Sequence, residues 1–311
     1  MSHYLVVGFG PAGAATARLL VERGHSVRVV TRSGRDPEPG IEHVALDAAD
    51  SERLTAAARG AAAVFGCAAP PYHRWADAWP PLAASLLAAA EATGAVLVLL
   101  GNLYGYGPVD GPLTEALPPA ATEPKGRVRA EVWERARALH EQGRVSAVEV
   151  RASDFFGPGV TDGGHLAARV VPRVLRGKPV SVIGDPDAPH SWSYVPDVAR
   201  ALVEVAGDER ALGRAWHVPT EPARSAREMV ALLAARAGTE PVAVRGIPSA
   251  VLGAAALFSP LIRELREVRY QFDRPFVLDS RAYEAAFGLR ATPVDAQVRA
   301  TVEWWRARAS A

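Results

Sequence analysis

The sequence predicts an α/β fold with a doubly wound parallel sheet and a smaller, interleaved C-terminal lobe. Three observations favour it. Strand-like and helix-like stretches alternate through the first half of the chain. A glycine-rich turn joins the first of these strands to the first helix. The most apolar stretch, residues 95–100, is a continuous run of the kind found in a central parallel strand covered on both faces.

The glycine-rich turn has the spacing of a dinucleotide-binding site. Apolar residues 4–7 lead into Gly8, Gly10 and Gly13, and apolar residues at helical spacing follow. In such a turn the first glycine permits the tight bend, the second lets the backbone approach a pyrophosphate, and the third lets the helix pack closely on the strand. The helix N-terminus then directs its N–H groups at the phosphates, so the sequence predicts a Rossmann-type cofactor site. Its residues are Gly8, Gly10, Pro11, Ala12 and Gly13.

The end of the second strand indicates which dinucleotide binds. Residues 26–30 form that strand, and Thr31, Arg32 and Ser33 follow it where NAD-binding proteins usually carry an Asp or Glu for the ribose hydroxyls. An arginine suits a 2′-phosphate, and no carboxylate stands there to repel it. Asp36 lies further along the loop, and we expect it to be beyond reach of the ribose. The sequence therefore predicts NADP(H) rather than NAD(H).

Composition argues against several other classes of protein. A formal net charge of +1 does not favour a general nucleic-acid partner. The single cysteine, Cys67, allows no internal disulfide, and no Cys/His cluster has the spacing of a metal site. The longest apolar run, residues 250–258, is too short to span a bilayer, and the first strand begins too close to Met1 for a signal peptide. We therefore expect a cytoplasmic protein that acts on a small molecule, with no metal, nucleic acid or membrane partner.

Further strands and helices are predicted in order along the chain. The strands are residues 44–46, 62–65, 95–100 and 146–150, and the helices are residues 50–59, 82–93 and 127–142. The second half has helix 165–175, strand 180–183 and helix 225–237, the last opened by a capping box of Ser225 with Glu228. We expect residues 1–155 to form the cofactor domain, with 190–220 returning to it, and residues 156–311 to form mainly the substrate lobe.

Segments spread along most of the chain resemble one known family. They are Asp47, residues 66–69, Tyr104-Gly105, and residues 151–158, 192–199, 216–218, 277–279 and 287–288. In this order they resemble the NAD(P)-dependent epimerase/dehydratase group, the extended branch of the short-chain dehydrogenase/reductase superfamily. The resemblance implies a small C-terminal substrate lobe and a chain that can form homodimers. It also implies that Asp47 lies near the adenine, Cys67, Ala68 and Ala69 near the cofactor ribose and phosphates, and residues 153–157 beside the nicotinamide and substrate.

The sequence departs from this family at its catalytic residues. The family uses a Tyr-x-x-x-Lys pair, in which tyrosine relays a proton and lysine holds the ribose, together with a Ser or Thr that binds the substrate oxygen. With lysines only at 125 and 178, the motif would need tyrosine at position 121 or 174, and those residues are Ala121 and Val174. Lys125 stands at the position of the family's tyrosine and Arg129 at the position of its lysine. The family's Ser or Thr is expected just before Tyr104, but residues 94–113 contain no serine or threonine.

Four residues are candidates for the chemistry. Lys125 could act as acid, base or amine nucleophile, but it could equally be a solvated lysine at the start of a helix. Arg129 could hold the nicotinamide ribose or a phosphate, since guanidinium is a permanent multi-donor. Asn102 and Tyr104 offer neutral donors where the central strand ends, which is where open α/β sheets bind ligands.

The predicted substrate contacts follow four of the predicted strands. They are Tyr72, Tyr106, Asp154, Phe155, His190 and Tyr194. Asp154 could orient a substrate amine or hydroxyl, or it could cap a turn. His190 borders the substrate in the resemblance, although a lone loop histidine is more often exposed. Residues 72–79 form either a lid or a loop that packs its aromatic side chains on the core.

The main functional prediction is an atypical NADP(H)-dependent oxidoreductase that reduces a carbonyl or imine of a small metabolite. Its basis is the glycine turn with Arg32. One alternative is an NAD(P)-dependent sugar-nucleotide epimerase or dehydratase, from the resemblance. Two others are a non-catalytic NADP-binding sensor and a non-redox enzyme on the same fold.

Overall fold

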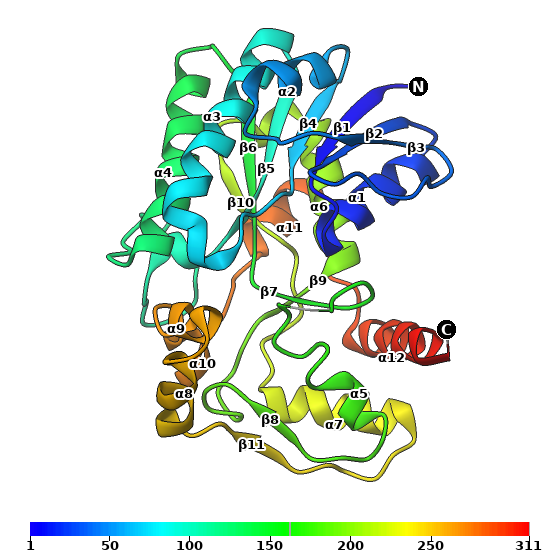
Figure 1. Ribbon diagram of the computed structural model, residues 1–311, viewed down its shortest axis with the longest axis vertical. Coiled ribbons are helices and arrows are strands. Elements are labelled where there is room, and N and C mark those ends of the chain that lie inside the picture. The colour runs from blue at the N-terminus through cyan, green and yellow to red at the C-terminus, as the bar shows by residue number, and fades with distance from the viewer. Residues whose placement is uncertain (162, 311) are drawn as a thin grey trace. The chain divides into compact units, whose positions relative to one another are not determined.

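The computed structural model describes residues 1–161 and 163–310, and these divide into two compact units (Figure 1). Unit 1 contains Met1–Gly107, Pro118–Ala152 and Val198–Val218. Unit 2 contains Pro108–Leu117, Ser153–Asp197 and Pro219–Ala311. The predicted fold class is confirmed: an α/β unit with a parallel sheet is accompanied by a smaller unit that interrupts it in sequence.

Unit 1 is built on a seven-stranded, all-parallel sheet with the order β10-β6-β5-β4-β1-β2-β3. The strands are β1 (His3–Val7), β2 (Ser26–Thr31), β3 (Ile41–Ala45), β4 (Ala63–Gly66), β5 (Val96–Asn102), β6 (Ala147–Ala152) and β10 (Ala215–His217). The order reverses between β1 and β4. In open α/β sheets this switch point is where ligands bind, outside the carboxyl ends of the strands.

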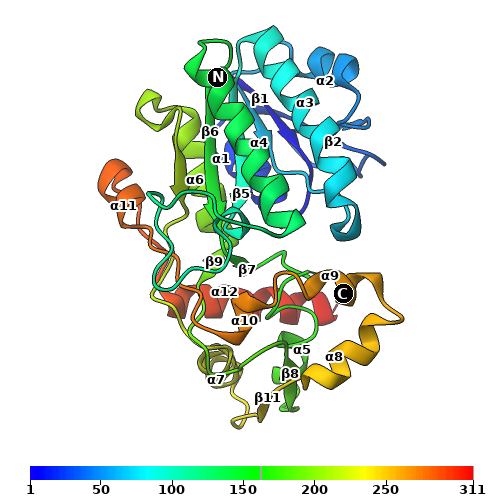
Figure 2. The same ribbon diagram turned by 90° about the vertical axis from the view of Figure 1, so that its left-hand side faces the viewer.

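Helices cover both faces of this sheet (Figures 1 and 2). On one face lie α2 (Ser51–Ala58), α3 (Trp75–Thr93) and α4 (Pro124–Glu141), and on the other lie α1 (Pro11–Glu22) and α6 (Val195–Ala206). Three short 3₁₀ turns, Tyr72–Arg74, Tyr104–Tyr106 and Glu209–Ala211, complete the unit. The main apolar core fills the space beneath α2, α3 and α4, and includes Leu54, Val64, Leu86, Leu97 and Ala136.

Local signals in the sequence explain how several of these elements begin and end. Pro11 occupies the first turn of α1, where a missing N–H costs nothing. The side chain of Asp50 accepts a hydrogen bond from the backbone N–H of Arg53 and caps α2. Gly94 adopts a left-handed conformation and ends α3.

Two helices of unit 1 begin earlier than the sequence predicts. We expected α3 to begin at residue 82, but it begins at Trp75 and contains Pro80 and Pro81 in its interior. Prolines usually mark a helix boundary, because each removes a backbone hydrogen bond. Here Trp75 and Trp79 are 7% and 3% exposed, and their burial outweighs that cost. α4 begins at Pro124 rather than at residue 127, so Lys125 lies in its first turn.

Unit 2 has two small parallel sheets and several helices. Its strand pairs are β7 (Asp154–Phe156) with β9 (Trp192–Tyr194) and β8 (Val180–Val182) with β11 (Val244–Gly246). Its helices are α5 (Val171–Val174), α7 (Ala226–Ala237), α8 (Ser249–Ala256), α9 (Pro260–Leu265), α10 (Tyr270–Asp273), α11 (Arg281–Phe287) and α12 (Val294–Ser310). The predicted capping box of α7 is confirmed, with both of its hydrogen bonds formed. The predicted helix 165–175 was wrong: residues 165–170 form turns and only α5 is helical. Pro172 stands in the first turn of α5, where it lacks the N–H that a helix continuing from residue 165 would need.

Candidate active site

The glycine turn between β1 and α1 has a shape that only glycines allow at two of its positions. Gly8 has φ +96°, and a Cβ there would lie 2.6 Å from the backbone of Ala68, while a Cβ on Gly13 would collide with the carbonyl oxygen of Gly8. A Cβ on Gly10 would meet nothing within 4 Å. Gly10 is also the N-cap of α1 and makes no side-chain cap bond to its N–H groups. These features fit the pyrophosphate of a dinucleotide, with the helix N–H groups directed at it.

Polar groups gather where β2 and β3 end. Thr31 closes β2, and Arg32 and Ser33 follow it with exposed side chains. The hydroxyl of Thr31 and both ring nitrogens of His43 are buried without a hydrogen-bond partner among the residues described. Unsatisfied buried groups are costly, so a ligand at this end of the cradle would lower the free energy of the site.

Phe9 and His43 were not predicted as part of this end of the cradle. The ring of Phe9 lies 5.0 Å from that of His43, and the guanidinium of Arg35 lies 5.8 Å from the same Phe9 ring. Arg35 is thus, with Arg32, one of two arginines in the loop that follows β2. Asp47, predicted near the adenine, is exposed and accepts a hydrogen bond from the backbone of Ala49.

The segment Cys67, Ala68 and Ala69 follows β4, beside the glycine turn. The backbone N–H of Cys67 donates to the carbonyl of Val7, which joins the ends of the two strands. Burial raises the pKa of the Cys67 thiol to about 12. The sulfur therefore stays protonated at neutral pH, and this residue is no nucleophile.

Lys125 lies among aromatic side chains at the start of α4. It is 3% exposed, and its Nζ lies 5.2 Å from the centre of the Tyr72 ring. The hydroxyl of Tyr72 donates to that of Tyr104 at 2.9 Å, and Asn102 Oδ1 accepts the backbone N–H of Tyr104. The structure thus brings four predicted residues together, and the alternative of a solvated Lys125 is wrong.

Arg129 lies one turn further along α4 and is held in the protein interior. Its Nη2 donates to the carbonyl of Leu100 at 2.8 Å and lies 3.4 Å from Glu149 Oε1, while its guanidinium stacks over Trp79 at 4.2 Å. Burial lowers the pKa of Arg129, and Glu149 opposes this effect. Its Nε and Nη1 are buried without partners in the described part of the chain.

Glu149 was not predicted, although a glutamate in an otherwise apolar strand is a visible signal. It is 2% exposed and also accepts a hydrogen bond from Arg151 Nε at 2.6 Å. Next to it, Tyr106 is 1% exposed and its hydroxyl lies 2.8 Å from His217 Nε2. These side chains form a buried polar network under the end of the central strands.

The remaining predicted substrate residues lie in unit 2. In the β7–β9 pair Asp154 stands opposite Trp192 and Phe155 opposite Ser193, and Tyr194 is the next residue along β9. His190 precedes β9, and its Nε2 lies 2.8 Å from Asp154 Oδ2. The histidine is 3% exposed, so the alternative of an exposed loop histidine is wrong.

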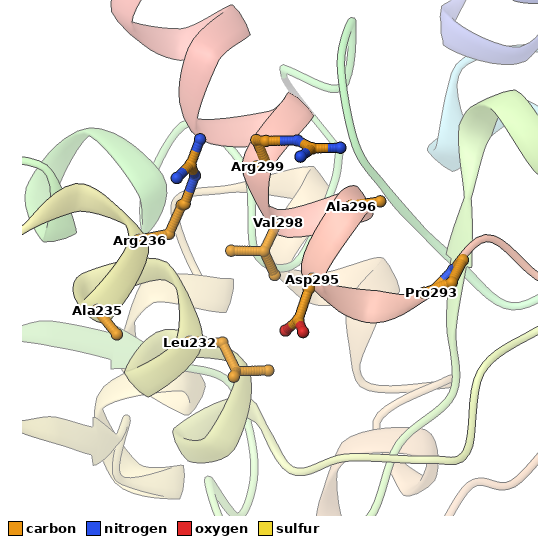
Figure 3. A pocket seen from close by; sticks show the side chains of 8 residues that line it. All are labelled: Leu232, Ala235, Arg236, Pro293, Asp295, Ala296, Val298 and Arg299. Atoms are coloured by element: carbon orange, nitrogen blue, oxygen red, sulfur yellow. The ribbon is translucent and has the colours of Figure 1, made fainter.

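A hollow of about 470 Å³ lies between α7 and α12 (Figure 3). Its lining residues are Leu232, Ala235, Arg236, Pro293, Asp295, Ala296, Val298 and Arg299. None of the predicted site residues is among them. Within residues 1–161 and 163–310, three or more His, Cys, Asp or Glu side chains nowhere gather as metal ligands would. Among the same residues no helix has the length and apolar character needed to cross a bilayer.

The parallel sheet and glycine cradle define a dinucleotide-binding α/β protein. The chain matches the NAD dependent epimerase/dehydratase family over residues 4–218, and it belongs to that family. No curated protein matches the chain in sequence.

Solved structures share the fold at low identity. A dTDP-glucose 4,6-dehydratase from Bacillus anthracis, in complex with NAD, has a TM-score of 0.81 and 17% identity over 100% of this chain and 98% of its own. A double mutant of dTDP-glucose 4,6-dehydratase from Streptomyces venezuelae gives 0.80 and 21% over 99% and 98%. A UDP-glucuronic acid 4-epimerase from Bacillus cereus gives 0.77 and 14% over 98% and 99%. At such identities the likeness concerns the fold.

Proposed function

We propose that this protein is an oxidoreductase that transfers hydride between NADP(H) and a carbonyl or imine carbon of a small metabolite. The observation that carries the proposal is the glycine cradle, where Gly10 leaves open space beside the uncapped N-terminus of α1. Its fit to a pyrophosphate, together with membership of a nicotinamide-dependent family, supports redox chemistry.

Lys125 takes the proton-transfer role in this proposal. When bound, the reduced nicotinamide supplies the hydride for the substrate carbon. The Lys125 ammonium donates a proton to the oxygen or nitrogen that becomes negative, so the product is an alcohol or amine. Arg129 is permanently charged and is held in place by Leu100 and Glu149. It therefore supplies positive charge to the site and does not donate a proton.

The choice of NADP(H) over NAD(H) rests on the arginines after β2. Arg32 is exposed at the strand end, Arg35 lies over Phe9, and no carboxylate occupies residues 31–33. A guanidinium pairs well with a 2′-phosphate. The two dehydratase structures described above contain NAD, so a preference for NADP(H) distinguishes this chain from them.

A second candidate is a sugar-nucleotide epimerase or dehydratase that returns the hydride to its substrate. The comparisons favour this candidate over net reduction, since the family and the three solved structures are named for epimerase or dehydratase activity. The catalytic residues favour net reduction: Lys125 stands where the family has tyrosine, and residues 94–113 offer no serine or threonine for a sugar hydroxyl. Net consumption of NADPH distinguishes the two.

The first test is a fluorescence titration with NADPH and NADH, after mass analysis for any nucleotide retained in purification. We expect an empty site that prefers NADPH. Arg32→Glu should weaken NADPH binding about 10- to 100-fold, the value of one or two charge-assisted bonds, and should leave NADH binding unchanged. The matched control is Arg59→Glu, at an exposed arginine that ends α2.

Each other outcome selects a different function. Retained NAD, with turnover of a sugar nucleotide and no net change in cofactor, establishes the second candidate. Binding without turnover points to a sensor, and chemistry that needs no cofactor points to a non-redox enzyme. If neither nucleotide binds, the redox proposal is refuted.

A further inference from the structure

Unit 2 contains a hydrogen-bonded pair, His190 and Asp154, that the proposed chemistry does not use. His190 Nε2 and Asp154 Oδ2 are 2.8 Å apart, and the side chains are 4% and 17% exposed. The other ring nitrogen of His190, Nδ1, lies 3.1 Å from the carbonyl oxygen of Gln271. The two residues are 36 positions apart in sequence, and the β7–β9 pairing brings them together.

The hydrogen bonds of this pair hold both side chains in place. A carbonyl oxygen only accepts, so His190 Nδ1 donates a hydrogen bond to Gln271. Burial alone would raise the pKa of Asp154, but its hydrogen bond with His190 holds the pKa below its usual range. Asp154 is therefore a carboxylate whose position is set by His190 Nε2.

Aromatic rings surround the side chain of His190 and leave the Asp154 carboxylate more open. The His190 ring lies 4.4 Å from Trp192, 5.4 Å from Phe272 and 5.5 Å from Phe276. Such rings exclude water from the imidazole and fix its orientation. Asp154, in contrast, has His190 as its one hydrogen-bond partner among the described residues, although it can accept several bonds.

His165 adds no positive charge near the carboxylate. Its ring stacks on Phe272 at 4.3 Å, and burial lowers its pKa to about 4. The His190 side of the pair is thus enclosed, and the Asp154 carboxylate is the more accessible side. Among the described residues, only His190 and His165 act electrostatically to lower the pKa of Asp154, and His165 is neutral at pH 7. An anion would be repelled by this carboxylate, whereas a donor group would complete its hydrogen bonds.

We propose that Asp154, held in place by His190, is the point at which unit 2 binds an uncharged or cationic hydrogen-bond donor of the substrate, a hydroxyl or an ammonium group. A carboxylate or phosphate is excluded at this point. The proposal names a substrate group for the enzyme proposed above and so rests on that function. The binding itself requires neither cofactor nor hydride transfer, and it can therefore be tested separately.

The test uses three probes that share a three-carbon chain and a hydroxyl at carbon 2. They are 1-amino-2-propanol, 1,2-propanediol and lactate, which end in an ammonium, a hydroxyl and a carboxylate. Binding is followed at pH 7 by the shift of the ¹H–¹³C ring signal of His190, identified from its loss in His190→Gln. We expect the amino alcohol and the diol to shift the signal with millimolar affinity, and lactate to bind at least tenfold more weakly.

Asp154→Asn should abolish this ranking, since the amide has no charge and can also donate. The control is Asp187→Asn, the same substitution at an exposed aspartate of unit 2 that pairs with Arg227. The control should keep the ranking of the wild type. If Asp154→Asn does not fold, the ranking in the wild-type protein alone decides.

Three results would overturn the proposal. They are lactate binding as tightly as the amino alcohol, an unchanged ranking in Asp154→Asn, and no shift with any probe up to about 100 mM, the weak limit expected for such small fragments. A protein that binds no nicotinamide but keeps the predicted ranking would refute the redox function and leave the donor-binding site established.

Discussion

At the scale of single residues, Lys125 has a setting that an ordinary surface lysine lacks. The chain has only two lysines, and the other, Lys178, is exposed in unit 2. Lys125 is 3% exposed and lies against the face of Tyr72, where removal from water strengthens its electrostatic effect on a neighbouring atom. A buried lysine next to two hydrogen-bonded tyrosines is suited to stabilising negative charge on a substrate oxygen.

Replacing Lys125 tests this role directly. Lys125→Met keeps the length of the side chain and removes the proton and the charge, and we expect NADPH-dependent turnover to fall about 100-fold or more with the NADPH dissociation constant little changed. Lys178→Met should alter neither quantity. Both are measured by following NADPH absorbance and by the cofactor titration. Undiminished turnover in Lys125→Met would remove this lysine from the mechanism.

Gly10 and Gly13 offer a matched pair of substitutions within one turn. A Cβ on Gly13 would strike the carbonyl of Gly8, whereas one on Gly10 would stand in open space with φ −72°. We expect Gly13→Ala to lower the free energy of unfolding by about 1–3 kcal/mol, as overpacking does. Gly10→Ala should change it by less than about 0.5 kcal/mol but weaken NADPH binding, because the added methyl occupies the space of the phosphate.

Urea unfolding and cofactor titration of the two variants separate folding from binding. The wild-type protein, unfolded with and without NADPH, is the reference for both measurements. If Gly10→Ala bound NADPH as the wild type does, the open space beside Gly10 could not be the phosphate site, and the cofactor proposal would lose its main support.

At the scale of elements, prediction succeeded where the signal is local. The strand β1, the glycine turn, β2 and the capped α7 follow from apolar runs, glycine spacing and a four-residue capping motif, and the structure has all of them. Their determinants lie within a few residues of one another in sequence. Tertiary contacts reinforce these preferences without having to reverse them.

The start of α3 shows what local signals miss. Pro80 and Pro81 predict a boundary, and the residues before them read as a loop. In the structure the rings of Trp75 and Trp79 meet at 6.0 Å, and Trp75 stacks with Tyr104 at 5.8 Å. The contact between Trp75 and Tyr104 joins segments almost 30 residues apart. Their burial, rather than helix propensity, stabilises the first turns of α3.

The sequence predicted which residues form the candidate site better than it predicted the contacts that those residues make. The sequence singled out Lys125, Arg129, Asp154 and His190, but not whether each is exposed or buried. That depends on Tyr72 reaching Lys125 and on Glu149 reaching Arg129 from β6. Such pairings arise only when strands and helices assemble, and no spacing within one element encodes them.

At the scale of the whole molecule, buried histidines link the free energy of unfolding to pH. Burial lowers the pKa of His165 to about 4, well below its ordinary value of 6.5. Between these values the unfolded chain binds a proton that the folded chain does not, so the free energy of unfolding falls as the pH falls. Above pH 6.5 both states are neutral at this ring and the contribution is constant. The lowered pKa of Asp154 acts in the same direction, but only below its ordinary value of 3.8.

Replacing His165 by phenylalanine should remove this part of the pH dependence. The new ring can keep the stacking on Phe272, but it cannot take up a proton in either state. Between pH 7 and pH 5 we expect the wild type to lose about 1–2 kcal/mol more of its unfolding free energy than His165→Phe does, allowing for partial exposure of the ring. Urea unfolding at half-unit steps of pH measures both slopes.

His3 also has a lowered pKa, caused first by burial. Because His3 is present in both proteins, the difference between their two slopes isolates the contribution of His165. The pH slopes of the two proteins should coincide between pH 7 and 8. If they also coincide between pH 5 and 6.5, His165 takes up protons in the folded protein as it does in the unfolded chain. That result would contradict the enclosed aromatic setting of the Asp154–His190 pair.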